Sequence, residues 1–314
     1  MKIDELLEGK KSLAITGHVR PDGDCVGSTL ALYGYVQKNF PDIRADIFLE
    51  KPTDKLSFIC NFDKINSDYK SDITYDIMIC LDSASRERIG KANRFFRTAG
   101  LTVNIDHHVS NPGYADINHV EGDSSSACEV LYGLLDPSKL SRDIAISLYT
   151  GIIYDTGVFK YQATTPQTMR IAAELMEYDI PTNFIIDNSF YAKTYDENRI
   201  FGYALMNSRL AYGGCVIYSS ISKREMQEFG ATGQDLEGIV AQLRLVLGIR
   251  CAIFLSETAP GECKVSLRSN DDVDVNVVAA AFGGGGHVRA AGATLKGTLD
   301  ECMNALLEEV GKVI

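Results

Sequence analysis

Four short apolar segments in the first 107 residues constrain the fold of this chain more than any other feature. They read "KSLAITGH" (11–18), "ADIFLE" (45–50), "YDIMICLD" (75–82) and "LTVNIDH" (101–107). Each is nearly continuous in apolar residues, which is typical of strands buried on both faces of a parallel sheet. Helical patterns fall between or after them, at 25–40, 125–135, 142–155 and 165–178. The first half therefore predicts an α/β fold, an open and mostly parallel sheet with helices on both faces.

A second, smaller α/β unit is predicted toward the C-terminus. Strand patterns occupy 214–222, 251–256 and 263–269, with helical patterns at 236–248 and 275–282, a glycine-rich segment at 283–295 and a terminal helix. The polar and aromatic stretch between the two halves has a helical character. We therefore predict a first domain over 1–185, a helical linker over 186–212 and a second domain over 213–314.

Acidic residues and histidines gather where three of the predicted strands end. In an open parallel sheet, ligands bind outside the carboxyl ends of the strands, so these side chains should converge on one crevice. A further acid closes the apolar helical pattern that ends in "IIYD". The residues concerned are His18, Asp22 and Asp24, then Asp82, then Asp106, His107 and His108, and finally Asp155.

Six of these residues make a set of metal ligands. His18, Asp22, Asp24, Asp82, His107 and Asp155 provide two imidazoles and four carboxylates, enough for two divalent cations if one carboxylate bridges them. Two cations about 3.5–4 Å apart form a clamp for in-line displacement at phosphorus. A mixed nitrogen and oxygen set favours Mn²⁺ over Mg²⁺, and residue type leaves zinc and iron open.

Each element alone has an ordinary structural explanation. Asp82 by itself is typical of a cap or turn residue, and Asp155 before Thr-Gly is typical of a turn. It is their order along the chain, at successive strand ends, that favours a common site. His119, in "INHV", has no partner motif and is interpreted as an ordinary strand residue.

The charge and the hydropathy of the chain limit its partners. A net charge of −11 argues against binding along long duplex nucleic acid, because phosphate neutralisation drives such binding. A short phosphorylated substrate held through metal ions remains compatible with it. No apolar run is long enough to cross a bilayer, the N-terminus does not have the pattern of a signal peptide, and eight cysteines are scattered without a C-x-x-C pair. We therefore expect a cytoplasmic protein with no membrane contact.

Four motifs in order resemble those of the DHH phosphoesterase superfamily: "HVRPDGDCVGS", "LDSAS", "DHH" and "DTG". The segment 266–294 resembles the DHHA1 substrate domain, so the likeness extends from residue 12 to 295. Among its members, a chain of this size is most similar to the NrnA-type bifunctional oligoribonucleases and 3′,5′-bisphosphate nucleotidases. Exonucleases of the RecJ type and membrane-tethered cyclic-dinucleotide phosphodiesterases share the motifs but carry further domains.

The resemblance implies how the ligands are divided between two ions. His18, Asp22 and Asp82 would hold one ion. Asp82 would bridge to the second, whose other ligands would be Asp24, His107 and Asp155. Arg20 and Cys25 stand where the family pattern varies, and neither is at a ligand position.

The resemblance also implies catalytic roles for two residues. His108 would face the scissile phosphate and stabilise its charge or assist the departing oxygen, and Asp106 would fix the orientation of an imidazole. The expected reaction cleaves short oligoribonucleotides, such as the dinucleotide pApA, to nucleoside 5′-monophosphates. It would also remove the 3′-phosphate from adenosine 3′,5′-bisphosphate.

The second domain is expected to select the substrate. The run Gly283–Gly286 offers backbone amides to a phosphate as an anion nest, and Arg268 offers a planar fork. The predicted substrate-binding residues are Arg268, Ser269, Asn270, Gly284, Gly285, Gly286 and His287, with Arg289 left open.

Several alternatives remain at this point. A cyclic-dinucleotide phosphodiesterase would use the same motifs, and a non-catalytic nucleotide sensor would use the same fold, although sensors usually lose ligands. An inorganic pyrophosphatase is disfavoured by the glycine-histidine loop and Arg268. Apolar stretches in the first domain leave a homodimer open.

Overall fold

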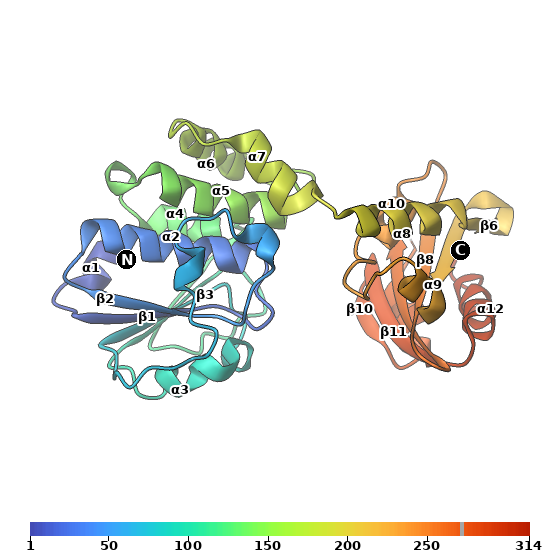
Figure 1. Cartoon of the computed structure of the whole chain (residues 1–314), viewed down its shortest axis with the longest axis horizontal. Helices are drawn as coiled ribbons and strands as arrows, with labels where there is room; N and C mark the ends of the chain where they lie inside the picture. The colour runs from blue at the N-terminus through green and yellow to red at the C-terminus, as the bar shows by residue number, and fades with distance from the viewer. Residues whose placement is uncertain (271–272) are drawn as a thin grey trace. The chain divides into compact units, whose positions relative to one another are not determined.

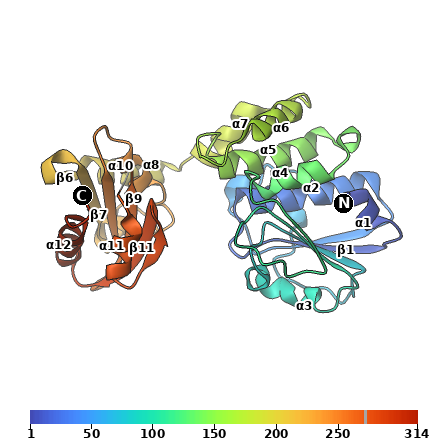
Figure 2. The same cartoon turned by 180° about the vertical axis from the view of Figure 1, so that it is seen from behind.

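The chain forms two compact units in the computed structural model, which describes residues 1–270 and 273–314 (Figures 1 and 2). Unit 1 comprises Met1–Ala192 and unit 2 comprises Lys193–Ile314. The predicted linker 186–212 spans this division. Within it, helix α8 (Tyr195–Met206) places the buried side chains of Ile200 and Ala204 in the core of unit 2, so α8 packs as part of that unit.

Unit 1 is built on a five-stranded sheet in the order β2-β1-β3-β4-β5, with every pair parallel. The strands are β1 (Ser12–Thr16), β2 (Arg44–Phe48), β3 (Ile77–Leu81), β4 (Thr102–Asp106) and β5 (Ile117–Val120). The predicted parallel sheet is confirmed, and its first four strands coincide with the predicted segments except that β2 begins one residue earlier, at Arg44. The edge strand β5 is half-exposed, which explains its weak apolar pattern. The chain leaves β1 toward β2 on one side and returns to β3 on the other, so a topological switch point lies between β1 and β3.

Helices cover both faces of this sheet, as predicted (Figure 1). One face carries α2 (Gly23–Asn39), α4 (Ala127–Leu134) and α5 (Arg142–Thr156) over the larger apolar core, with α6 (Pro166–Met176) and α7 (Thr182–Ile186) packed on α5. The other face carries the short α3 (Asn93–Phe96) over an aromatic cluster, in which the rings of Phe48 and Phe95 stack at 4.1 Å. The short α1 (Ile3–Leu7) adds buried side chains to the larger core.

Unit 2 contains a six-stranded mixed sheet in the order β10-β11-β9-β8-β7-β6. Among the strands that the structure describes in this sheet, β7 and β8 pair in parallel, and the other neighbours are antiparallel. The strands are β6 (Arg209–Ala211), β7 (Val216–Ile221), β8 (Cys251–Ala259), β9 (Glu262–Ser269), β10 (Gly285–His287) and β11 (Ala290–Lys296). The smaller α/β unit predicted for this half is confirmed.

The two faces of this second sheet have separate cores. Side chains such as Ile217 and Phe254 pack under α8, α9 (Lys223–Glu228) and α10 (Ile239–Arg244), whereas Ile253 and Val265 pack under α11 (Val275–Ala281) and α12 (Leu299–Val310). Helix α9 was not predicted, although the capping box formed by Ser222 and Glu225 marks its start. Within residues 1–270 and 273–314, no helix combines the length and the apolar character that a membrane crossing requires.

Candidate metal centre

The switch point of the unit 1 sheet brings His18 and Asp82 together. His18 follows β1 and Asp82 follows β3, and the two strands are neighbours. Nε2 of His18 lies 3.3 Å from Oδ2 of Asp82, and both side chains are almost fully buried. Nδ1 of His18 is 2.8 Å from the carbonyl oxygen of Val19, so Nε2 is the ring nitrogen that faces the acid.

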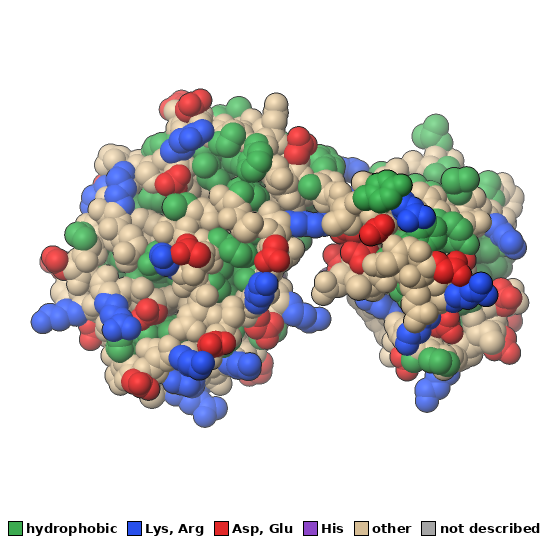
Figure 3. All heavy atoms as spheres, viewed as in Figure 1, with side chains coloured by type: hydrophobic (Ala, Val, Ile, Leu, Met, Phe, Trp, Pro, Cys, Tyr) green, Lys and Arg blue, Asp and Glu red, His purple; other side chains and the backbone are tan. Residues whose placement is uncertain are grey.

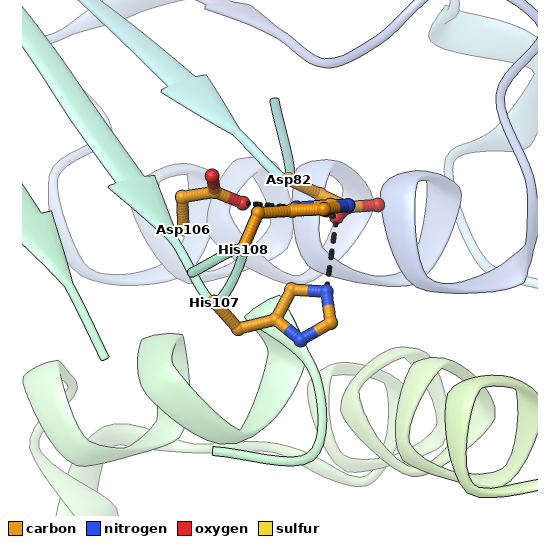
Figure 4. A group of neighbouring side chains, drawn as sticks. All are labelled: Asp82, Asp106, His107 and His108. Atoms are coloured by element: carbon orange, nitrogen blue, oxygen red, sulfur yellow. Dashed lines mark hydrogen bonds and ion pairs between the residues drawn. The ribbon is translucent and has the colours of Figure 1, made fainter. Parts of the chain in front are cut away.

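The end of β4 adds two more imidazoles to Asp82, as Figure 4 shows. Nε2 of His107 lies 3.5 Å from Oδ1 of Asp82 and 3.3 Å from Oδ2 of Asp155, which projects from the last turn of α5. Nδ1 of His108 lies 3.7 Å from the same Oδ1 of Asp82. Asp82 is therefore the carboxylate that His18, His107 and His108 all face.

The start of α2 contributes the remaining two acids. Asp22 is the N-cap of α2, and its Oδ1 accepts hydrogen bonds from the backbone amides of Asp24 and Cys25 while lying 3.6 Å from Nε2 of His18. Asp24 is fully buried, and its carboxylate accepts bonds of 2.6 and 3.0 Å from the amides of Ala127 and Cys128 at the start of α4. Amides at a helix N-terminus favour a negative charge, so they hold Asp24 in place.

The close approach of α2 and α5 depends on Gly151. A methyl group at this position would lie 2.3 Å from Sγ of Cys128 and 2.6 Å from Oδ1 of Asp24. Any side chain at Gly151 would therefore collide with the acid itself. Asp155 follows one turn later on α5, so this contact sets how near Asp155 comes to Asp24.

The backbone of Asp82 has an unusual conformation. Its φ angle is +50°, in the left-handed region that residues other than glycine rarely occupy. The amide of Asp82 donates a 3.1 Å hydrogen bond to the carbonyl oxygen of Ile105 at the end of β4, which holds this conformation. Strained residues of this kind cluster at functional sites.

Crowding of the acids shifts several pKa values in this cluster. Burial, together with the charge of Asp82, raises the pKa of Asp24 to about 7. Burial and the charges of Asp24 and Asp82 raise the pKa of Asp155 to about 9. Burial opposes protonation of His18 and His107, but their acidic neighbours outweigh it and raise the pKa of each ring to about 10. Burial likewise acts against ionisation of Asp82, yet hydrogen bonds from the two imidazoles hold its pKa below the ordinary range.

These residues fit divalent cations. Ligand atoms of Asp24, His107 and Asp155 lie within 4.8 Å of one another, as do those of His18, Cys25 and Asp82, and those of Asp82, Asp106, His107 and His108. Carboxylates packed this closely repel one another unless positive charge is supplied. Carboxylate oxygens and imidazole nitrogens are the donors that Mn²⁺ and Zn²⁺ accept. Five of the six predicted ligands lie in these groups, and the sixth, Asp22, lies 3.6 Å from Nε2 of His18.

Two residues near this cluster were not predicted to belong to it. Sγ of Cys25 lies with the ligand atoms of His18 and Asp82, although the sequence placed Cys25 outside the ligand positions. The side chain of Asn111 donates a 2.6 Å hydrogen bond to Asp106, which is fully buried and also bonds His108. A sequence signal existed for Asn111, since it closes the mostly polar string "DHHVSN" that begins at Asp106, the last residue of β4.

In unit 2 the pairing register places two of the predicted substrate-binding residues on one face. Arg268 of β9 pairs with Ala290 of β11, and Ala290 pairs with His287 of β10. Residues paired directly across strands point to the same side of a sheet, so Arg268 and His287 flank the small Ala290. Arg268 also pairs with Ala252 of β8, which packs under α8 and α10, so all of these residues face that side.

The other predicted residues of unit 2 make bonds or contacts within the unit. Ser269 is buried, and its hydroxyl donates to the carbonyl oxygen of Val288. The amide of Asn270 donates to the carbonyl oxygens of Arg244 and Ile249 and accepts from the guanidinium of Arg244. These two side chains hold the end of β9 through bonds to the unit's own residues.

The glycine run has a packing requirement of its own. A methyl group on Gly284 would lie 2.2 Å from the carbonyl oxygen of Gly292, and one on Gly286 would lie 2.4 Å from that of Ala290. Gly285 and Gly286 are exposed on β10, at the edge of the sheet. The close pairing with β11 therefore accounts for glycine at 284 and 286.

Comparison with known proteins identifies the family. The model described as "DHH family, N-terminal domain" matches residues 12–152, and the DHHA1 domain model matches residues 213–314. The chain is also 31% identical over 300 residues to the bifunctional oligoribonuclease and PAP phosphatase NrnA of Thermus thermophilus, covering 94% of this chain and 88% of that protein. The chain is a phosphoesterase of the DHH family.

Two further relatives cover nearly the whole of this DHH phosphoesterase. The bifunctional oligoribonuclease and PAP phosphatase NrnA of Bacillus subtilis is 30% identical over 286 residues, which is 88% of this chain and 87% of that protein. The crystal structure of an exopolyphosphatase-related protein from Bacteroides fragilis matches with a TM-score of 0.87 and 26% identity. That alignment covers 98% of this chain and 94% of the other.

Proposed function

We propose that this DHH phosphoesterase hydrolyses short oligoribonucleotides to nucleoside 5′-monophosphates and removes the 3′-phosphate from adenosine 3′,5′-bisphosphate. We also propose that it uses two bound divalent cations, with Mn²⁺ as the preferred metal. It is supported by the names of the two NrnA relatives and by the donor set of the cluster.

The observation that carries the proposal is the convergence of His18, Asp82 and His107 from three neighbouring strand ends, joined by acids from α2 and α5. Two bound cations would neutralise charge on the phosphate and lower the pKa of water. In our scheme His18, Asp22 and Asp82 hold one cation, and Asp24, Asp82, His107 and Asp155 hold the other.

His108 is the residue that we assign to the scissile phosphate. Its Nδ1 donates to Oδ1 of Asp106 at 2.8 Å, which leaves Nε2 of the partly exposed ring as the nitrogen free to meet a substrate. In the protonated ring, Nε2–H would donate a hydrogen bond to a phosphoryl oxygen or pass its proton to the departing oxygen, whereas a neutral ring with its proton on Nδ1 has none on Nε2 to give. Asp106 contributes by holding the ring in that orientation.

Arg268 and His287 are proposed to bind a second phosphate of the substrate. They share one face of the unit 2 sheet, and a guanidinium and an imidazole are suitable donors to phosphate oxygens. Ser269 and Asn270 are proposed to support the end of β9, and the exposed residues Gly285 and Gly286 to let a phosphate approach the backbone closely.

A short substrate also fits the charge of the chain. On the face shown in Figure 3, acidic and basic side chains are interspersed over each unit. With a net charge of −11, few phosphates can be contacted favourably, so short oligonucleotides and nucleotide bisphosphates are the proposed partners.

A metal-supplemented panel of substrates tests the proposed function. The purified chain is supplied with Mn²⁺ and assayed on pApA, 5′-phosphorylated RNAs of increasing length, adenosine 3′,5′-bisphosphate and cyclic di-AMP. We expect turnover of pApA and of the bisphosphate, and a fall in rate as the RNA lengthens. Faster turnover of cyclic di-AMP than of pApA would show a cyclic-dinucleotide phosphodiesterase instead, and nucleotide binding without any product would show a sensor.

A further inference from the structure

Each polar group of the Asn111 side chain has a hydrogen-bond partner next to the candidate metal centre. Its Nδ2 donates to Oδ2 of Asp106 at 2.6 Å and to the carbonyl oxygen of Ser83 at 3.1 Å. Its Oδ1 accepts from the amide of Gly113 at 2.9 Å. An asparagine amide has two donor hydrogens and one acceptor oxygen, so each of these groups has a partner within unit 1.

The bond to Asp106 matters because Asp106 is fully buried. A buried carboxylate is costly unless hydrogen bonds compensate its charge. Its two oxygens are divided, Oδ1 receiving Nδ1–H of His108 and Oδ2 receiving Nδ2–H of Asn111. Without Asn111, Oδ2 would lose this partner, and the carboxylate would be free to turn about its own axis.

The bond from Asn111 to Asp106 affects the orientation of the His108 ring. That side chain is 38% exposed, so packing alone does not fix its orientation. The backbone amide of Asn111 also donates a 3.0 Å bond to the carbonyl oxygen of His108, which closes the turn that carries both residues. The ring direction is thus set by Asp106, and the direction of Asp106 is set by Asn111.

We infer that Asn111 is a positioning residue for this phosphoesterase, acting through Asp106 to hold the imidazole of His108 toward the substrate. The inference rests on the proposed role of His108. Groups that orient a catalytic side chain in this way typically change rate by about 10–100-fold when removed.

Two variants form a matched pair for the test. Asn111→Ala removes the bonds to Asp106, Ser83 and Gly113. Asn118→Ala removes a comparable set nearby, since the side chain of Asn118, on β5, donates to the carbonyl oxygen of Ala115 and accepts from the amide of Ala115, away from the cluster. We expect Asn111→Ala to lower kcat on pApA about 10–100-fold with KM changed less than about threefold, and Asn118→Ala to leave both unchanged.

A double-mutant cycle separates positioning from general loss of structure. If Asn111 acts through His108, then adding Asn111→Ala to His108→Ala should lower kcat no further. The affinity for Mn²⁺, measured by calorimetry, should stay the same in Asn111→Ala. Losses that multiply in the double variant, or a weaker Mn²⁺ affinity, would overturn the inference and show that Asn111 acts through Ser83 and Asp82.

A readout that does not need turnover keeps this inference distinct from the proposed function. In ¹H–¹⁵N spectra of the Mg²⁺-supplemented protein, the Nδ1–H signal of His108 should be visible in the wild type and in Asn118→Ala. It should be lost to solvent exchange in Asn111→Ala. An unchanged signal would contradict the inference even if no oligonucleotide were cleaved, whereas a changed signal without cleavage would contradict only the proposed function.

Discussion

At the scale of single residues, Asp82 is the centre of the site. It combines a left-handed backbone, near-complete burial and a position faced by three imidazoles. In our scheme Asp82 is the ligand that bridges the two cations, so its loss should weaken the binding of both. An amide in its place would keep the shape while removing the charge.

We therefore expect Asp82→Asn to lower turnover of pApA by at least about 100-fold, since even residues that only orient ligands cost about 10–100-fold. Circular dichroism should show a retained fold, and calorimetry should show weakened Mn²⁺ binding. Glu121→Gln is the matched control, because Glu121 also pairs with a histidine, His119, at 2.7 Å but stands outside the cluster. Turnover within tenfold of the wild type in Asp82→Asn would contradict the scheme.

At the scale of elements, the site depends on how closely α5 approaches α2 and α4. Gly151 sits where Sγ of Cys128 and Oδ1 of Asp24 leave no room for a side chain. Helix propensity favours alanine over glycine by about 1 kcal/mol, so a glycine kept within a helix points to a packing requirement.

Gly151→Ala should destabilise the chain by about 1–3 kcal/mol through overpacking, despite the gain in helix propensity, and should lower Mn²⁺ affinity by displacing Asp24. Gly133→Ala in α4 is the control, because a methyl group there meets nothing within 4 Å. That variant should be as stable as the wild type or up to about 1 kcal/mol more stable. Denaturant unfolding measures the free energy of unfolding of both variants. Equal values for Gly151→Ala and Gly133→Ala would show that α2 and α5 have room to separate.

At the scale of the whole molecule, the cluster links stability to pH and to metal. His18 and His107, with pKa values raised from 6.5 to about 10, hold protons more tightly in the folded chain. The stability this gives is complete below pH 6.5 and is lost as the pH rises toward 10. The pKa values of Asp24 and Asp155 are raised from 3.8 to about 7 and about 9, so these residues also hold protons more tightly in the folded chain. Their contribution therefore also lowers the stability as the pH rises above 3.8.

We expect the metal-free protein to lose thermal stability between pH 6.5 and 9. A cation binds the deprotonated ligands, so Mn²⁺ should raise the melting temperature more at pH 8 than at pH 6.5. Metal at 100 times its Kd would add about 2.7 kcal/mol. Scanning fluorimetry with Mn²⁺ or with EDTA measures this. If Mn²⁺ raised the melting temperature by the same amount at both pH values, the result would count against the site. The same holds if Mn²⁺ stabilised Asp82→Asn as much as the wild type.

Much of the fold was predictable because its signals are local. Continuous apolar runs marked β1 to β4, and helical periodicity marked α2, α4, α5 and α6, since burial on both faces of a parallel sheet leaves no polar alternation. The edge strand β5 and the short α9 gave weaker patterns, because half-exposed and short elements need few apolar residues.

The sequence by itself determined the types of the candidate ligands and placed His18, Asp82 and His107 at three strand ends, because parallel strands deliver their carboxyl ends to one edge of a sheet. Only the tertiary structure decided which acid faces which imidazole, and it brought Cys25 and Asn111 to the cluster. It also showed that the side chains of Ser269 and Asn270 hydrogen-bond to other residues of unit 2. Apart from Asn111, which lies only five residues after Asp106, these outcomes depend on contacts between segments distant in sequence, which side-chain packing fixes and local pattern does not encode.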